Sequence, residues 1–243
     1  MPVREIAIVV PAYNEAQRIV PSLEKILTFL PAHFGSSEVL LVDDGSTDGT
    51  ADLVEQRFAG KVRVLRQPMR RGKGSAVRAG VLDARKGWIL FVDADLSIPI
   101  DEALLLCARA GGAPEVPVVI GSKRAPGSRT EYPALRRMLG GVGQLLISLF
   151  VVRGLHDTQC GIKLYRADVG KRLFSASRID GFGFDFEVLF LARRLGYPIA
   201  EVPIRCEHKV GGTVRLRTYL RVLSEVARLN LYRLRGLYPP RAT

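Results

Sequence analysis

The 243-residue sequence contains few of the residues that build metal clusters and covalent frameworks. It has three histidines and only three cysteines, Cys107, Cys160 and Cys206. The cysteines are too few and too widely spaced for a zinc site or a disulfide framework. Their scarcity is typical of a protein in the reducing cytoplasm. We therefore expect a fold held together by an apolar core, for which 47% hydrophobic residues are sufficient.

Long apolar runs are also absent. The longest stretch without a charged side chain is residues 138–152, which is 15 residues, whereas a helix that crosses a bilayer needs roughly 20. The first residues have neither the length nor the cleavage site of a secretory signal. We expect no transmembrane helix and no secretory leader.

Two common phosphate-binding patterns are missing as well. In residues 71–75, Lys73 is followed by glycine and the upstream glycine of a Walker loop is absent. No dinucleotide-binding glycine pattern follows the first predicted strand. The glycines beside Arg71 and Lys73 still suit an anionic ligand near a helix N-terminus, and a solvated basic loop is the alternative.

Positive charge is what the chain has in excess, with a net charge of +12. In residues 205–243, nine basic residues against Glu207 and Glu225 give a local net charge of +7. Such a surplus favours phosphate-bearing partners, which include nucleic acid, anionic lipid and nucleotides.

The first half of the chain alternates between two apolar patterns. Short runs rich in β-branched residues predict strands, and apolar residues at helical spacing predict helices between them. This alternation predicts an α/β fold with a doubly wound, mostly parallel sheet. The predicted strands are residues 5–10, 38–42, 62–65, 88–92 and 116–120, and the predicted helices are residues 19–30 (ended by Pro31), a helix through Phe58, 75–84 and 102–110.

The second half is less regular. We expect helices at residues 136–152, 185–195 and 216–234, with strands at 161–165 and 199–206. The last helix is basic and amphipathic. We therefore predict one domain at residues 1–210, divided near residue 125 into two halves, followed by a basic C-terminal helix in residues 211–243.

Three polar clusters follow predicted strands, at residues 11–15, 43–45 and 93–95. Ligands of doubly wound sheets bind at the carboxyl ends of the strands, so we expect one shared site. Asp93 and Asp95 can both reach one hard cation such as Mg²⁺ or Mn²⁺, although a turn that favours aspartate is the alternative. The adjacent Asp43 and Asp44 repel each other unless a donor-rich group binds them.

Taken in order, residues 10–15, 42–49, 71–74 and 92–95 resemble family 2 glycosyltransferases. Residues 95–100, 121–124, 157–163 and 183–187 are similar to the branch that contains dolichyl-phosphate glucosyltransferases and mannose synthases. The resemblance covers residues 5–210 and implies the fold of nucleotide-diphospho-sugar transferases, known as GT-A.

The resemblance also implies roles for individual residues. Arg124 and Arg136 would bind the acceptor phosphate, and Ser97 stands where some relatives place a glutamine that ligates the metal. Asp93 and Asp95 would serve the metal and the diphosphate. The nucleotide sugar would be bound by Pro11, Ala12, Tyr13, Glu15, Asp44, Lys73, Asp93, Ala94 and Asp95.

The implied reaction is inverting transfer of a hexose from UDP-glucose or GDP-mannose to a polyprenyl or dolichyl phosphate. A phosphate monoester has a second pKa near ~6, so it is a nucleophile at neutral pH without a general base. A glycan or small-molecule hydroxyl acceptor would need a base, for which Asp157 and Asp185 are candidates beside the catalytic Asp95. Asp185 could instead stabilise a helix N-terminus.

The basic C-terminal helix suggests peripheral attachment to an anionic membrane surface on the cytoplasmic side. A solvated helix end or an oligomer contact is the alternative. Phe182, Phe184 and Phe186 are expected to pack in the core, with a lipid channel as the alternative. The sequence pI of about 10.1 would also suit nucleic acid, but no interleaved stacking aromatics accompany the cations, so we expect no nucleic-acid partner.

Overall fold

A computed structural model describes residues 3–130, 151–207 and 216–241, and the side chains of residues 216–222 fall outside that description. The helix expected at residues 136–152 therefore lies outside the described residues except for its last two. Arg136 and His208 lie outside them too.

The strands are β1 (Glu5–Ala12), β2 (Ser36–Asp43), β3 (Arg63–Arg66), β4 (Trp88–Val92), β5 (Val118–Ser122), β6 (Arg129–Thr130), β7 (Ile162–Arg166), β8 (Ile199–Pro203) and β9 (Arg205–Cys206). The helices are α1 (Ile19–His33), α2 (Thr50–Arg57), α3 (Lys73–Asp83), a 3₁₀ turn η1 (Ile100–Glu102), α4 (Ala103–Ala110), α6 (Ala167–Ala176), α7 (Phe184–Arg194) and α8 (Leu216–Leu234).

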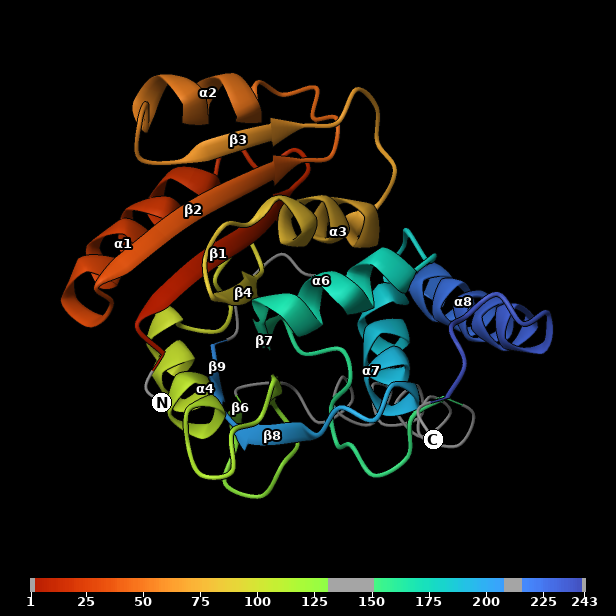
Figure 1. Ribbon diagram of the computed structural model, residues 1–243. Helices are drawn as coiled ribbons and strands as arrows, with labels where there is room; N and C mark the ends of the chain where they lie inside the picture. Colours follow the sequence, from red (N-terminus) through yellow and green to blue (C-terminus); the bar gives the residue numbers. More distant parts are fainter. Residues whose placement is uncertain (1–2, 131–150, 208–215, 242–243) are drawn as a thin grey trace.

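Seven strands form the main sheet in the order β3-β2-β1-β4-β7-β5-β8 (Figure 1). All neighbouring pairs are parallel except the two that involve β7, which runs antiparallel to both β4 and β5. The predicted doubly wound, mostly parallel sheet is confirmed. Strands β6 and β9 form a separate two-stranded sheet.

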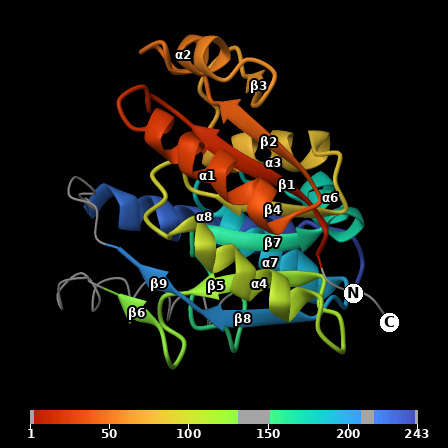
Figure 2. The same cartoon turned by 90° about the vertical axis from the view of Figure 1, so that its left-hand side faces the viewer.

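The sheet has an apolar core on each face because successive strand residues point to opposite sides. Ile6 and Ile8 of β1 pack with α1, α2 and α4, whereas Ala7 and Val9 pack with α3, α6 and α7. Figure 2 shows α1 and α4 on the near face of the sheet and α3 on the far face. The result is three layers, with the strand ends left uncovered at one edge.

Three predictions of local structure were wrong. Helix α1 continues past Pro31 to His33, because a proline in the last turn forfeits only one backbone hydrogen bond and the amide of Phe34 still bonds to Leu30. The strand expected at 199–206 is two strands in different sheets, β8 and β9. Helix α6 had no counterpart among the predicted elements.

Helix α8 packs on the same core as α7. Its Val226 and Leu229 belong to the apolar cluster that covers one face of the sheet. Leu229 is 0% exposed, whereas Leu234, a turn further on, is 85% exposed. Among the residues of α8 whose side chains the structure describes, 223–234, one face packs into the fold and the other is exposed.

This asymmetry predicts different effects for two leucines on one helix. Leu229→Ala should lower the free energy of unfolding by about 2–5 kcal/mol, because it leaves a cavity in the core. Leu234→Ala should change it by less than about 0.5 kcal/mol. Urea-unfolding curves of both variants measure the difference. Equal effects would show that α8 does not contribute to this core.

Candidate active site

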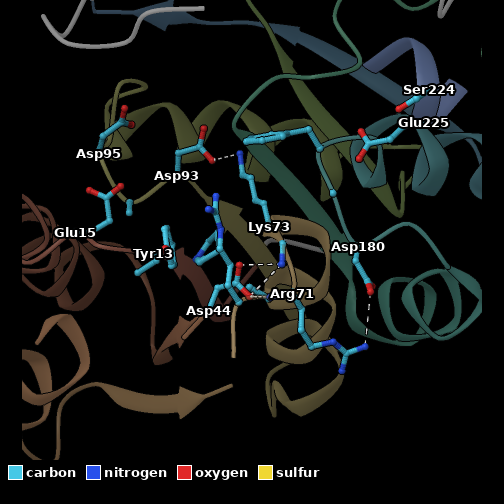
Figure 3. Close-up of a pocket in the computed structure, with 18 of the residues that line it drawn as sticks. Tyr13, Glu15, Asp44, Arg71, Lys73, Asp93, Asp95, Asp180, Ser224 and Glu225 are labelled. Carbon is cyan, nitrogen blue, oxygen red and sulfur yellow. Dashed lines mark hydrogen bonds and ion pairs between the residues drawn. The ribbon is translucent and has the colours of Figure 1, made fainter. Parts of the chain in front are cut away.

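A cavity of about 780 Å³ opens at the carboxyl ends of β1, β2 and β4 (Figure 3). Its volume lies within the roughly 300–1,000 Å³ that is usual for small-molecule sites. It brings together all three polar clusters expected from the sequence. The lining residues are Pro11, Ala12, Tyr13, Glu15, Asp44, Arg70, Arg71, Gly72, Lys73, Ala76, Asp93, Ala94, Asp95, Asp180, Gly181, Phe182, Ser224, Glu225 and Arg228.

The loop after β1 is held in place by the loop after β2. Asn14 adopts a left-handed conformation with φ of 55°, which asparagine tolerates better than most residues. Its side-chain oxygen accepts a hydrogen bond from the Thr47 amide at 2.9 Å, and the Glu15 amide donates to the Thr50 hydroxyl at 2.9 Å. These contacts fix Tyr13 and Glu15 at the cavity wall.

The ring of Tyr13 is covered by the guanidinium of Arg70. The guanidinium carbon of Arg70 lies 4.0 Å from the ring centroid, within the range of a cation–π interaction. Nothing in the sequence marks Arg70, because it lies outside the pattern formed by Arg71 and Lys73. Together Tyr13 and Arg70 offer planar groups to a ligand with a flat ring.

Asp44 is 3% exposed and is bound by backbone donors. The amides of Arg71 and Gly72 donate to its carboxylate at 2.8 and 2.9 Å, and the neighbouring Asp43 accepts from the Ser46 amide at 3.1 Å. The protein's own amides therefore supply part of the donor-rich group expected from the sequence. Asp44 still lines the cavity.

The turn after β4 aims two carboxylates into the cavity. Leu96 closes it with a left-handed φ of 44° and a buried side chain, a conformation that costs on the order of 1–3 kcal/mol. The Ser97 amide donates to Asp95 at 2.9 Å. A Cβ atom at Gly161 would lie 2.2 Å from the Asp93 carboxylate, so only glycine fits beside Asp93.

Lys73, the first residue of α3, forms an ion pair with Asp93 at 2.6 Å. In Figure 3 the two side chains point toward each other in the middle of the cavity. Burial lowers the pKa of Lys73, but the charges of Asp93 and Asp185 outweigh it, and the net shift of that pKa is upward. Lys73 therefore stays protonated at neutral pH.

Asp93 and Asp95 fit a hard divalent cation by the chemistry of their oxygen atoms. Mg²⁺ and similar ions bind through one or two carboxylates and complete their shell with water and substrate phosphates. Within the described ranges, no group of three or more histidine, cysteine, aspartate or glutamate side chains could hold a metal. Water and substrate phosphates would complete the shell of a metal held by Asp93 and Asp95.

Asp185 lies behind the cavity instead of lining it. It occupies the first turn of α7 and forms a buried ion pair with Lys163, which is 0% exposed. The Lys163 ammonium also donates to the carbonyl of Cys160 at 2.6 Å. Burial raises the pKa of Asp185, and the charges of Lys163 and Lys73 offset part of that rise.

Asp157 and Arg124 are also absent from the residues that line the cavity. Asp157 is buried, accepts a hydrogen bond from the Lys123 amide at 3.1 Å and lies 3.8 Å from the Lys123 ammonium. Arg124 is half-buried in the turn after β5. The Nδ1 atom of His156 lies 2.8 Å from a carboxylate oxygen of Glu201, and His156 does not line the cavity.

The side of the cavity opposite Tyr13, which we call the far wall, was not predicted from the sequence apart from Phe182. Asp180, Gly181 and Phe182 precede α7, and Ser224, Glu225 and Arg228 come from α8. Phe184 and Phe186 are buried in the core as expected, but Phe182 is 40% exposed. The departure of Phe182 from the alternating pattern had no sequence signal, because it depends on contacts with α8.

A doubly wound sheet with an acid-rich cavity at its strand ends is the architecture of nucleotide-binding α/β enzymes. The chain belongs to glycosyl transferase family 2, whose model matches residues 7–174.

Relatives of known activity extend the match beyond the family model. A dolichyl-phosphate beta-glucosyltransferase from Drosophila melanogaster is 37% identical over 84% of this chain and 67% of its own length. One from Trichomonas vaginalis is 32% identical over 95% of this chain and 72% of its own length. The chain is therefore similar to this branch over most of its length.

Solved structures share the fold at low sequence identity. The glucosyl-3-phosphoglycerate synthase of Mycobacterium tuberculosis superposes with a TM-score of 0.70 at 22% identity, over 95% of this chain and 80% of that one. Its complex with Mn²⁺, UDP-glucose and phosphoglyceric acid gives a TM-score of 0.66 at 19% identity, over 93% of this chain and 79% of that one. These likenesses establish the GT-A type of fold.

The buried pair behind the cavity predicts a pH-dependent loss of stability. Lys163→Met leaves the Asp185 carboxylate buried without its cation, which should cost about 3–5 kcal/mol near neutral pH. Burial already raises the pKa of Asp185, and losing Lys163 should raise it further. A raised pKa in the folded state gives stability at low pH that is lost as the pH rises through it.

The gap in unfolding free energy between Lys163→Met and wild type should therefore narrow as the pH falls from about 8 to about 5. Urea unfolding across this range measures it. Lys61→Met, at an exposed lysine after α2, serves as the control and should show no gap. A gap that does not change with pH would mean that Asp185 is not the group responsible.

Proposed function

We propose that this protein is an inverting hexosyltransferase, dependent on a divalent metal, that transfers glucose from UDP-glucose to a polyprenyl phosphate such as dolichyl phosphate. GDP-mannose is the alternative donor. The observation that carries the proposal is one cavity in which an aromatic–arginine pair, buried carboxylates and cations lie side by side. The dolichyl-phosphate beta-glucosyltransferases among the relatives support the choice of sugar and acceptor.

The nucleoside would bind between Tyr13 and Asp44. The ring of Tyr13 and the guanidinium of Arg70 suit a planar base, and the oxygen atoms of Asp44 and Glu15 suit base N–H groups and ribose hydroxyls. Pro11 and Ala12 line the same part of the wall. Burial raises the pKa of Glu15, although Arg18 offsets part of the rise.

The diphosphate would lie along Asp93, Ala94 and Asp95, with the two carboxylates holding Mg²⁺ or Mn²⁺. A bound divalent cation would offset the negative charge that develops on the leaving diphosphate. Lys73, kept protonated by its acidic neighbours, supplies a fixed positive charge at the same place. Such preorganised charges usually make the largest single contribution to catalysis of this kind.

The placement of the acids supports a phosphate acceptor. A hydroxyl acceptor would need a general base in reach, yet Asp157 and Asp185 lie outside the lining of the cavity and face Lys123 and Lys163. Of the acids on the far side of the cavity, Asp180 is paired with Arg78 and Glu225 accepts from the Gly183 amide. A phosphate monoester needs no base. We keep Arg124 and Arg136 as the proposed acceptor-phosphate ligands and assign Asp185 a positioning role through Lys73.

A lipid acceptor also implies access to a membrane surface. Within the described ranges, no helix has both the length and the apolar character to cross a bilayer. Helix α8 exposes Leu223, Leu231 and Leu234 among arginines. An apolar stripe flanked by cations supports peripheral attachment at the cytoplasmic face of an anionic membrane.

Donor binding is tested by thermal unfolding with UDP-glucose and GDP-mannose, each with and without Mn²⁺. A ligand that binds only the folded state raises its stability by RT ln(1 + [L]/Kd), so the true donor should raise Tm and Mn²⁺ should increase the shift. Asp95→Asn should abolish the Mn²⁺-dependent part. Asp101→Asn, at an exposed acid in η1, is the matched control. No shift with either nucleotide sugar would contradict the proposal.

Catalysis is tested by transfer of radiolabelled glucose to a polyprenyl phosphate. Asp95→Asn should lower kcat/KM about 100-fold or more, because it removes charge stabilisation from the reacting centre. Asp185→Asn should lower it by less than about tenfold, since a phosphate acceptor needs no general base. If Asp185→Asn is as damaging as Asp95→Asn and a sugar acceptor replaces polyprenyl phosphate, the hydroxyl alternative is correct.

A further inference from the structure

The cavity has a second end that the proposed nucleoside and diphosphate sites leave unassigned. In Figure 3, Tyr13 and Glu15 lie on one side, Asp180, Ser224 and Glu225 on the other, and Asp93 and Lys73 between them. The far side is built by the loop before α7 and by α8. A donor extended from Tyr13 across Asp93 would place its sugar at this far side.

Phe182 is the aromatic side chain of that far wall. Lys73 links it to the diphosphate end, since its ammonium lies 2.6 Å from Asp93 and 5.9 Å from the Phe182 ring centroid. The ring is 40% exposed, and it lines the cavity although its neighbours Phe184 and Phe186 are buried. Ligand sites typically combine such an aromatic surface with a few placed polar groups.

The backbone on both sides of Phe182 contacts the side chain of Glu225. The Gly183 amide donates to Glu225 of α8 at 2.7 Å. A Cβ atom at Gly181 would lie 1.8 Å from the other Glu225 oxygen, and one at Gly183 would lie 2.8 Å from the Glu225 Cβ. Glycine is therefore required on each side of Phe182 for Glu225 to approach this closely.

The start of α3 holds the same loop from the opposite direction. The Ser75 amide donates to the carbonyl of Asp180 at 3.2 Å, and the Arg78 guanidinium pairs with the Asp180 carboxylate at 2.6 Å. A Cβ atom at Gly72 would lie 2.4 Å from that carbonyl. The loop that carries Phe182 is thus fixed between α3 and α8.

We propose that Phe182 is the platform on which the transferred hexose lies, and that Glu225 is the positioning residue that holds this platform. The proposal rests on the proposed function and names the hexose subsite of the same cavity. A hexopyranose presents a face of C–H groups that suits a flat ring, and hydroxyls around its edge. Ser224 and Arg228 of α8 lie at the cavity wall where they can meet those hydroxyls.

Calorimetric titration separates the sugar from the nucleotide. In the presence of Mn²⁺, Phe182→Ala should raise the Kd of UDP-glucose about tenfold, the loss expected for one aromatic contact. The Kd of UDP should change less than about twofold, because UDP lacks the group that contacts the ring. Phe182→Leu should also weaken UDP-glucose, since it keeps apolar volume but not a flat face. GDP-mannose and GDP are titrated in the same way.

Two further variants complete the experiment. Leu105→Ala, at an exposed leucine on α4 outside the cavity, should change neither Kd. Glu225→Ala should reproduce the selective loss of UDP-glucose affinity. Glu225→Gln should retain affinity, because an amide oxygen can still accept from Gly183. Melting temperatures confirm that each variant is folded.

The outcomes distinguish this inference from the proposed function. If wild type binds UDP-glucose or GDP-mannose but Phe182→Ala weakens nucleotide and nucleotide sugar equally, or weakens neither, the platform is refuted and the proposed function stands. If Phe182→Ala changes only the KM for polyprenyl phosphate, the ring serves the acceptor chain and the platform is also refuted. If wild type binds no nucleotide sugar, both fail.

Discussion

The ion pair between Lys73 and Asp93 is the interaction on which the rest of the site depends. It joins the start of α3 to the end of β4 across the centre of the cavity. Asp93 can occupy this position only because Gly161 has no side chain, and Lys73 lies half-buried there beside acids that favour its charged form. The pair therefore fixes the start of α3 against the end of β4 in the middle of the cavity.

Behind this pair lie two more charged side chains of alternating sign, Asp185 and Lys163. Asp185 contributes to the raised pKa of Lys73, and Lys163 offsets the burial of Asp185. Burying a lone charge at this depth would be costly, and the alternating signs offset part of that cost. The cavity thus has a fixed electrostatic pattern before any ligand binds, which means that little reorganisation is needed when negative charge develops on a substrate.

The sequence predicted what depends on local pattern. Strands that end close to Val10, Val42 and Val92 follow from apolar runs that stop at polar turns, and parallel strands bring such ends to one edge. It did not predict the far wall, because Phe182, Glu225 and Arg228 meet through contacts between segments some 40 residues apart in the chain. The location of Asp185 behind the cavity was likewise unpredictable, since it is set by its partner Lys163 on β7.

Helix α8 contributes to three environments at once. Leu229 lies in the core, Glu225 lies at the cavity and Leu234 faces solvent. A rigid helix transmits displacement from one face to another, so anything that binds its outer face more tightly in one state of the cavity must change the affinity of the cavity by the same factor. A ligand in the cavity and a partner on the outer face of α8 would then be thermodynamically linked through this one helix.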